Sequence, residues 1–211
     1  MKSARNIGGA LIALADLRVV QAIIACQLQN SNLKSGIVQL SSTCTRLLLR
    51  AKSTVLRAMQ FEGLESELVV EGQVILAGIY FLLNDLETAQ QEAVRAMEAS
   101  EKHELTRMLA RAYRLLGRIL SAQGEHEKAD PYFENALQIF RDYEFRLDYA
   151  RALHSYAETL LQRGHPGECT YKKGLDHLQK AHTIFAECHA AIDLEWTNQQ
   201  LASYKSETVE A

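Results

Sequence analysis

A repeat with a period of about 40 residues constrains the fold of this chain more than any other feature. Small residues recur at Ala77, Gly117 and Ala157, each inside an apolar helical pattern. Seven residues after each one comes a residue suited to ending a helix: Asn84, Gly124 and Gly164. A second helical pattern follows each time, so a helix, a turn and an antiparallel helix are predicted three times over.

The second helix of each unit carries a stripe of small and aromatic residues at intervals of four and three. In the middle unit this stripe is Ala129, Phe133 and Ala136. The chain contains only two prolines, and 47% of its residues are hydrophobic. Ala, Leu, Glu, Gln and Arg are good helix formers. The sequence therefore predicts an all-α protein.

The middle unit resembles the tetratricopeptide repeat family at seven positions: Tyr113, Leu116, Gly117, Leu120, Ala129, Phe133 and Ala136. The closing proline of that family is absent, since Arg141 stands there. The period of about 40 residues exceeds the family's 34 or so, which is similar to long-helix arrays in bacterial STAND-type ATPase regulators. The resemblance implies a right-handed superhelical solenoid of antiparallel helix hairpins with a C-terminal capping helix.

The expected domains follow from the register of the repeat. Residues 1–63 are predicted to be divergent N-terminal helices, one over about 4–28 and one or two over 35–61, with a loop near Asn30–Asn32 and Ser35–Gly36. Three repeats are expected at about 64–102, 103–143 and 146–189. A capping helix, Ala190 to Tyr204, and a frayed tail fill 190–211. The stripe of that last helix is Ile192, Leu194 and Leu201.

One row of arginines is the leading candidate for a binding site. Leu105 to Gly124 reads as one amphipathic helix on which four arginines fall within roughly 60° of one another. In tetratricopeptide arrays the first helix of each unit lines the concave groove. The resemblance therefore implies partner-binding positions along this groove: Arg107, Arg111, Arg114, Arg118, Ser121, Arg151, His154 and Glu158.

Two interpretations of this row remain open. Guanidinium groups bind carboxylates in a bidentate way, which favours recognition of an acidic peptide segment or a chain-terminal carboxylate. Alternatively, the row is a solvated helix face whose arginines pair with glutamates such as Glu104 or Glu158. Like charges at this spacing repel and weaken a helix. A row of four therefore calls for a compensating interaction.

Histidines and cysteines gather between His165 and His189, around an insertion, RGHPGECTYKKG. Their spacing matches no zinc motif, and no metal or other cofactor is expected. The insertion is interpreted as a loop whose residues Thr170 to Lys173 project as a contact point. The four cysteines are interpreted as reduced thiols, which favours a cytoplasmic protein.

No phosphate-binding glycine loop, nucleophile elbow or metalloprotease motif occurs, so an enzyme is not expected. The net charge of −3 gives no reason to expect nucleic acid or a membrane as partner. Lys2 and Arg5 precede an apolar run like that of a signal peptide, but the helical periodicity continues beyond it, which favours an ordinary first helix.

The predicted function is a protein-interaction scaffold that binds a peptide or a partner protein through its groove. Two alternatives remain: a sensor segment of a larger signalling ATPase or transcription regulator, and a structural subunit of a multiprotein complex.

Overall fold

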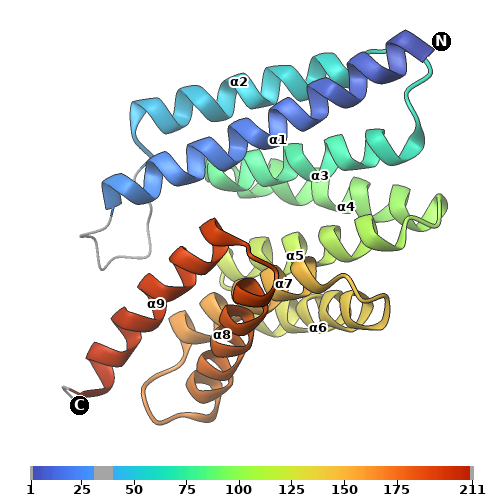
Figure 1. Ribbon diagram of the computed structural model, residues 1–211. Helices are drawn as coiled ribbons and strands as arrows, with labels where there is room; N and C mark the ends of the chain where they lie inside the picture. Colours follow the sequence, from blue (N-terminus) through green and yellow to red (C-terminus); the bar gives the residue numbers. More distant parts are fainter. Residues whose placement is uncertain (1, 31–39, 210–211) are drawn as a thin grey trace. The chain divides into compact units, whose positions relative to one another are not determined.

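The computed structural model describes residues 2–30 and 40–209, with side chains described within 6–23 and 40–204. Every regular element in these ranges is an α-helix, so the predicted all-α class is confirmed (Figure 1). The described helices are α1 (Lys2–Asn30), α2 (Ser42–Met59), α3 (Ser66–Leu82), α4 (Leu86–Lys102), α5 (Thr106–Ala122), α6 (His126–Asp142), α7 (Arg146–Arg163), α8 (Cys169–Glu187) and α9 (Ala191–Val209). They form two compact units, Met1–Leu115 and Leu116–Ala211, whose boundary falls inside α5.

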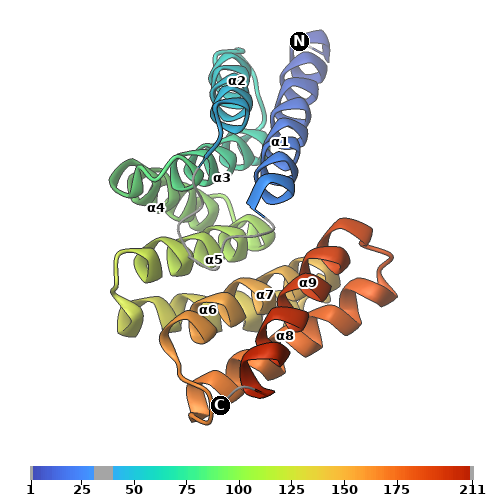
Figure 2. The ribbon, with the colours of Figure 1, turned by 90° about the vertical axis from the view of Figure 1, so that its left-hand side faces the viewer.

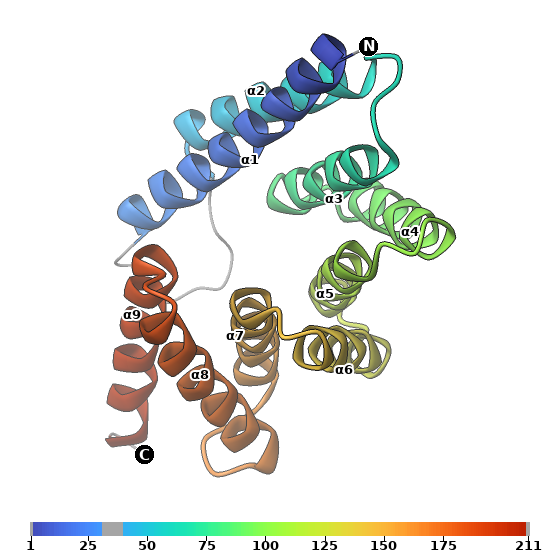
Figure 3. The same cartoon turned by 45° about the vertical axis from the view of Figure 1, so that its right-hand side comes forward.

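The first unit is built on two helix pairs. Helices α1 and α2 run antiparallel and both contact α3, which pairs in turn with α4 (Figures 1 and 3). On α2 the apolar residues recur at helical spacing, and Leu48, Ala51 and Val55 are at most 1% exposed. They pack with Ile12 of α1 and Ile79 of α3 in one cluster. This cluster joins α1 and α2 to the repeat region.

The second unit contains the end of α5 and helices α6 to α9. Helix α7 contacts α6 and α8, and α8 contacts α9 (Figure 2). Phe133 of α6 stacks on Tyr156 of α7 with ring centroids 4.7 Å apart. A Cβ atom at Gly117 would lie 2.9 Å from the Phe133 ring, so only glycine lets α5 and α6 approach this closely. The predicted role of Gly117 as a close-crossing residue is confirmed.

Five of the described helices end in the same kind of turn. At these five ends the residues with positive φ are Asn84, Glu104, Gly124, Glu144 and His189, with φ between 54° and 82°. After each of them the next N–H donates to a carbonyl five residues earlier, over 2.8–2.9 Å. This left-handed turn satisfies the last carbonyls of the helix. Helix α7 departs from this pattern, because Gly164 has φ −95° and ψ 153°.

Two boundaries differ from the sequence prediction. Helix α9 continues to Val209, beyond the expected end at Tyr204, because no proline or glycine interrupts its C-terminal residues. Helix α2 begins at Ser42, and the Ser41 hydroxyl caps it by accepting from the Cys44 N–H over 3.2 Å. Of the loop predicted near Asn30–Asn32 and Ser35–Gly36, Asn30 is the last residue of α1, and the rest lies outside the described residues.

Candidate functional site

The arginine row lies on α5, but neighbouring helices contact this helix on more sides than its sequence pattern suggests. Besides the expected Ala112 and Leu116, the residues Met108, Leu115 and Ile119 are at most 7% exposed. They lie between the predicted apolar face and the arginines. As a result Arg107 is exposed, whereas Arg111, Arg114 and Arg118 are half-buried. These three guanidinium groups emerge between packed side chains.

Arg111 forms an ion pair inside the first unit. Its Nη1 lies 3.4 Å from Glu71 Oε1 of α3, and the two side chains are 17% and 32% exposed. The sequence had suggested Glu104 or Glu158 as carboxylate partners for this row. Glu71 partners Arg111 because both occupy the same place in successive repeats, 40 residues apart. For Arg111 the paired interpretation therefore holds.

Arg151 occupies the equivalent position on α7 and forms a bidentate pair. Its Nε and Nη2 donate to the two carboxylate oxygens of Asp193 on α9, over 3.1 and 2.9 Å. Two turns further along α7, Glu158 accepts from Gln200 of α9 over 2.8 Å. Asp193 and Gln200 each lie 42 residues beyond their partners. Helix α9 therefore takes the position of a further first helix in the array.

His154 lies between these two pairs on α7. Its ring is 6.2 Å from that of Phe185, and its Nε2 is buried without a hydrogen-bond partner among the described residues. Ser121, at the end of α5, shares a hydrogen bond of 3.3 Å with His126 Nδ1 at the start of α6. The structure thus brings Arg151, His154 and Glu158 together, and it uses Ser121 in a turn between helices.

A polar cluster around the buried Tyr156 of the second unit was not predicted from the sequence. The Tyr156 side chain is 1% exposed, and Lys173 Nζ donates to its hydroxyl oxygen over 3.3 Å. Burial raises the pKa of Tyr156. Burial, aided by the positive charge of Lys173, lowers the pKa of His177 to about 4, and this ring lies 5.5 Å from that of Tyr156. No short-range sequence signal links these residues, because they come together only when α8 packs on α7.

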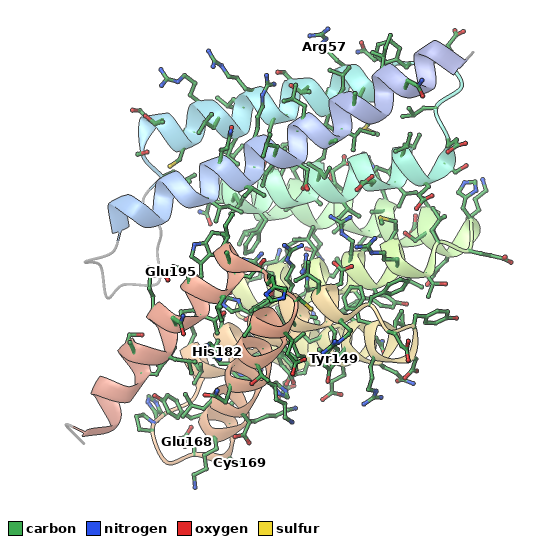
Figure 4. The ribbon with its side chains drawn as sticks, viewed as in Figure 1. Arg57, Tyr149, Glu168, Cys169, His182 and Glu195 are labelled. Atoms are coloured by element: carbon green, nitrogen blue, oxygen red, sulfur yellow. The ribbon has the colours of Figure 1, made fainter. Side chains whose placement is uncertain are left out.

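The predicted contact loop at Thr170 to Lys173 is wrong. Helix α8 already begins at Cys169, so these residues form its first turn. Tyr171 is 3% exposed and packs with Leu161 and Leu178. Glu168, labelled beside Cys169 in Figure 4, accepts from the His165 N–H over 2.9 Å and so closes the connection. A compact turn and a buried aromatic residue replace the expected projecting loop.

The described residues hold no group of three His, Cys, Asp or Glu side chains placed to bind a metal ion. His182, labelled in Figure 4, instead shares a hydrogen bond of 2.8 Å with Asn198 of α9. Cys44, Cys169 and Cys188 are free thiols, and the side chain of Cys26 lies outside the described set. Among the predicted site residues, Arg111, Arg151 and Glu158 instead form contacts between helices.

A family model described as a tetratricopeptide repeat matches residues 68–141 and, in a second placement, 108–168. This region of the chain belongs to the tetratricopeptide repeat family. The family consists in general of non-catalytic repeats that bind proteins or peptides, and this chain has the repeats of such an interaction scaffold.

The chain is similar to BtubC (BKLC) from P. vanneervenii, with 15% identity, a TM-score of 0.48, and coverage of 96% of this chain and 92% of that one. No curated protein matches the chain significantly. The tetratricopeptide assignment therefore rests on the repeat sequence itself.

Proposed function

We propose that the tetratricopeptide repeats of this chain bind an acidic segment of a partner protein or peptide along the first helices of the repeats. The observation that supports this proposal is the row of guanidinium groups on α5, a first helix inside the matched region. Arg107, Arg114 and Arg118 present planar donors that suit carboxylate groups. Arg111 adds rigidity, because its pair with Glu71 ties α5 to α3.

The helix pairs also favour binding without large rearrangement. Arg151 is clamped by Asp193, and Arg163 of α7 donates to both oxygens of Asp130 on α6 over 2.9 and 2.7 Å. Side chains and helices held in this way lose less conformational entropy when a ligand binds. The side chain of Arg151 is 43% exposed.

The test is titration of a labelled Glu- and Asp-rich peptide into the intact chain. The double variant Arg114→Ala, Arg118→Ala should weaken binding by about tenfold or more, because it removes two charge-assisted contacts. The matched control is Arg95→Ala, Arg141→Ala, which removes the same charge from α4 and α6, where these side chains are 61% and 67% exposed.

The control should bind like the unaltered chain. Equal affinity in the α5 double variant would overturn the proposal. Competition between a peptide with a free C-terminal carboxylate and its amide identifies which acidic group is recognised. A stable complex with a partner protein that the peptide does not displace would instead favour the role of structural subunit.

A further inference from the structure

The charges of this chain are divided very unevenly along its length. Of its 23 Lys and Arg residues, eight lie within 1–61, whereas Asp16 is the only one of its 26 Asp and Glu residues found there. The whole chain carries −3, so the average hides a strongly basic N-terminal segment. Such asymmetry points to an anionic partner for the basic part.

Helix α2 displays part of this charge on its outer face. Arg46, Arg50 and Arg57 are exposed, and their guanidinium groups form no ion pair with any residue that the structure describes. Arg57 projects from α2 away from the helices beneath it (Figure 4). On the same face Leu49 and Leu56 are 50% and 43% exposed, one beside each end of the arginine stripe. This surface therefore combines three exposed arginines with two exposed leucines.

Two neighbouring cations show what a structural role looks like in this segment. Arg18 of α1 donates to the Thr54 hydroxyl oxygen and, over 3.4 Å, to the Arg50 carbonyl oxygen. Lys52 lies over the Tyr80 ring of α3 at 4.5 Å from its centroid. These two charges tie α2 to its neighbours. The guanidinium groups of the three outer arginines of α2 make no such contact with a described residue.

Helix α1 adds a second apolar stripe. Ile7, Leu14 and Leu17 are 49%, 39% and 53% exposed, at heptad spacing. Of the seven large hydrophobic residues that are exposed in the described part of the chain, five lie on α1 and α2. By length and composition Asn6–Ile23 could even cross a membrane, but its Ile12, Ala15 and Ala22 are at most 1% exposed in the core. Only 22% of this window is buried, so α1 contributes a narrow stripe to the core and exposes much of its apolar surface.

We propose that the outer face of α2 docks on the surface of an anionic lipid bilayer. Arginines bind anionic headgroups, and aliphatic side chains between them enter the boundary of the acyl region. This proposal departs from the expectation of no membrane contact, which rested on the charge of the whole chain.

Other occupants fit the surface less well. A second copy packed by two-fold symmetry on this face would bring cationic stripes together, which repel. A protein partner would have to offer a matching acidic surface and pockets for both leucines in one fixed register. Along α2 the outer charges are all positive and the apolar groups are all aliphatic. A fluid lipid surface does not require side chains to align with fixed partners, so it suits a face whose charges are all positive.

The test is co-sedimentation of the full chain with vesicles of phosphatidylcholine alone and with vesicles containing about one-third phosphatidylserine. The chain should bind the second kind and not the first, and binding should fall as salt is raised. The variant Arg46→Gln, Arg50→Gln, Arg57→Gln should reduce partitioning on the order of 100-fold. Leu49→Ser, Leu56→Ser should reduce it about tenfold or more.

The matched control is Arg95→Gln, Arg141→Gln, Arg146→Gln, which removes three exposed arginines from other helices. It should bind vesicles like the unaltered chain, and circular dichroism should show all variants folded. The proposal is overturned if neutral and anionic vesicles bind equally, if neither binds, or if the control loses as much binding as the α2 variants. Self-association that the α2 variants abolish, without vesicle binding, would also overturn it in favour of a second copy.

Discussion

Arginine serves two different purposes in two regions of this molecule. On α7, Arg151 and Arg163 each make bidentate pairs with a carboxylate of a neighbouring helix, Asp193 and Asp130. On α2, three exposed arginines have no such partner among the described residues. The paired positions include those where the repeat register places an acidic residue on the adjacent helix. An arginine that faces a carboxylate of the adjacent helix holds the fold together, whereas one that faces none stays at the surface.

The largest expected effect contrasts two leucines, one from each region. Leu178→Ala should lower the free energy of unfolding by about 2–5 kcal/mol, because Leu178 is fully buried between α7 and α8. Leu49→Ala on α2 should change it by less than about 0.5 kcal/mol, because this side chain is half exposed. Urea unfolding measures both. A large loss for Leu49→Ala would show that the α2 face is structural.

A smaller effect is expected for the pair of Arg151 with Asp193. Asp193→Ala should cost about 1 kcal/mol of unfolding free energy, because it removes a bidentate pair that is partly exposed. A double-mutant cycle with Arg151→Ala should give a coupling of about 0.5–1 kcal/mol. On α2, Arg46→Ala should be neutral or slightly stabilising, since like charges repel. A coupling energy of zero between Arg151 and Asp193 would show that this pair stabilises the fold no more than the exposed arginines of α2 do.

The next effect concerns pH and the cluster around Tyr156. The pKa of His177 lies near 4 in the folded chain, below the ordinary 6.5, so the folded state binds fewer protons than the unfolded state. Its contribution to stability is therefore complete above pH 6.5 and is lost as the pH falls towards 4. His177→Gln should flatten this part of the pH profile of the melting temperature. His165→Gln, at an exposed position, is the control and should leave the profile unchanged.

The smallest expected effect tests the repeated turn. Glu144 holds φ at 57°, a conformation that favours glycine, so Glu144→Gly should stabilise the chain by about 0.5 kcal/mol. Glu127→Gly in the first turn of α6 should instead destabilise it by up to about 1 kcal/mol. Thermal unfolding compares the two variants. Destabilisation by both would show that the side chain of Glu144 matters more than its backbone strain.

Much of the fold could be predicted because each repeat carries residues whose type and spacing mark its helices and turns. Gly117, Asn84 and Gly124 mark close helix crossings or left-handed turns, and each of these roles follows from residue type and spacing. The start of α8 was missed because the turn that replaces the expected loop depends on a side chain, Glu168, that accepts from the backbone of His165. Such a contact leaves no periodic signal.

The candidate site was only partly predictable for a related reason. The positions on α5 and α7 were identified, but whether Arg111 or Arg151 pairs with a neighbour depends on which residue lies about 40 positions away across a packed interface. Asp193 was overlooked because α9 was taken for a cap and not for a helix in the same register. The basic face of α2 was overlooked because net charge was averaged over the whole chain.

One crossed experiment decides whether separate sets of arginines bind separate ligands. The acidic peptide and the phosphatidylserine vesicles are each titrated against two variants, Arg114→Ala with Arg118→Ala on α5, and Arg46→Gln with Arg50→Gln and Arg57→Gln on α2. We expect the α5 variant to lose binding to the peptide and to keep binding to the vesicles, and the α2 variant to do the reverse. Equal losses of both ligands in both variants would contradict this expectation, because total charge alone would then explain binding.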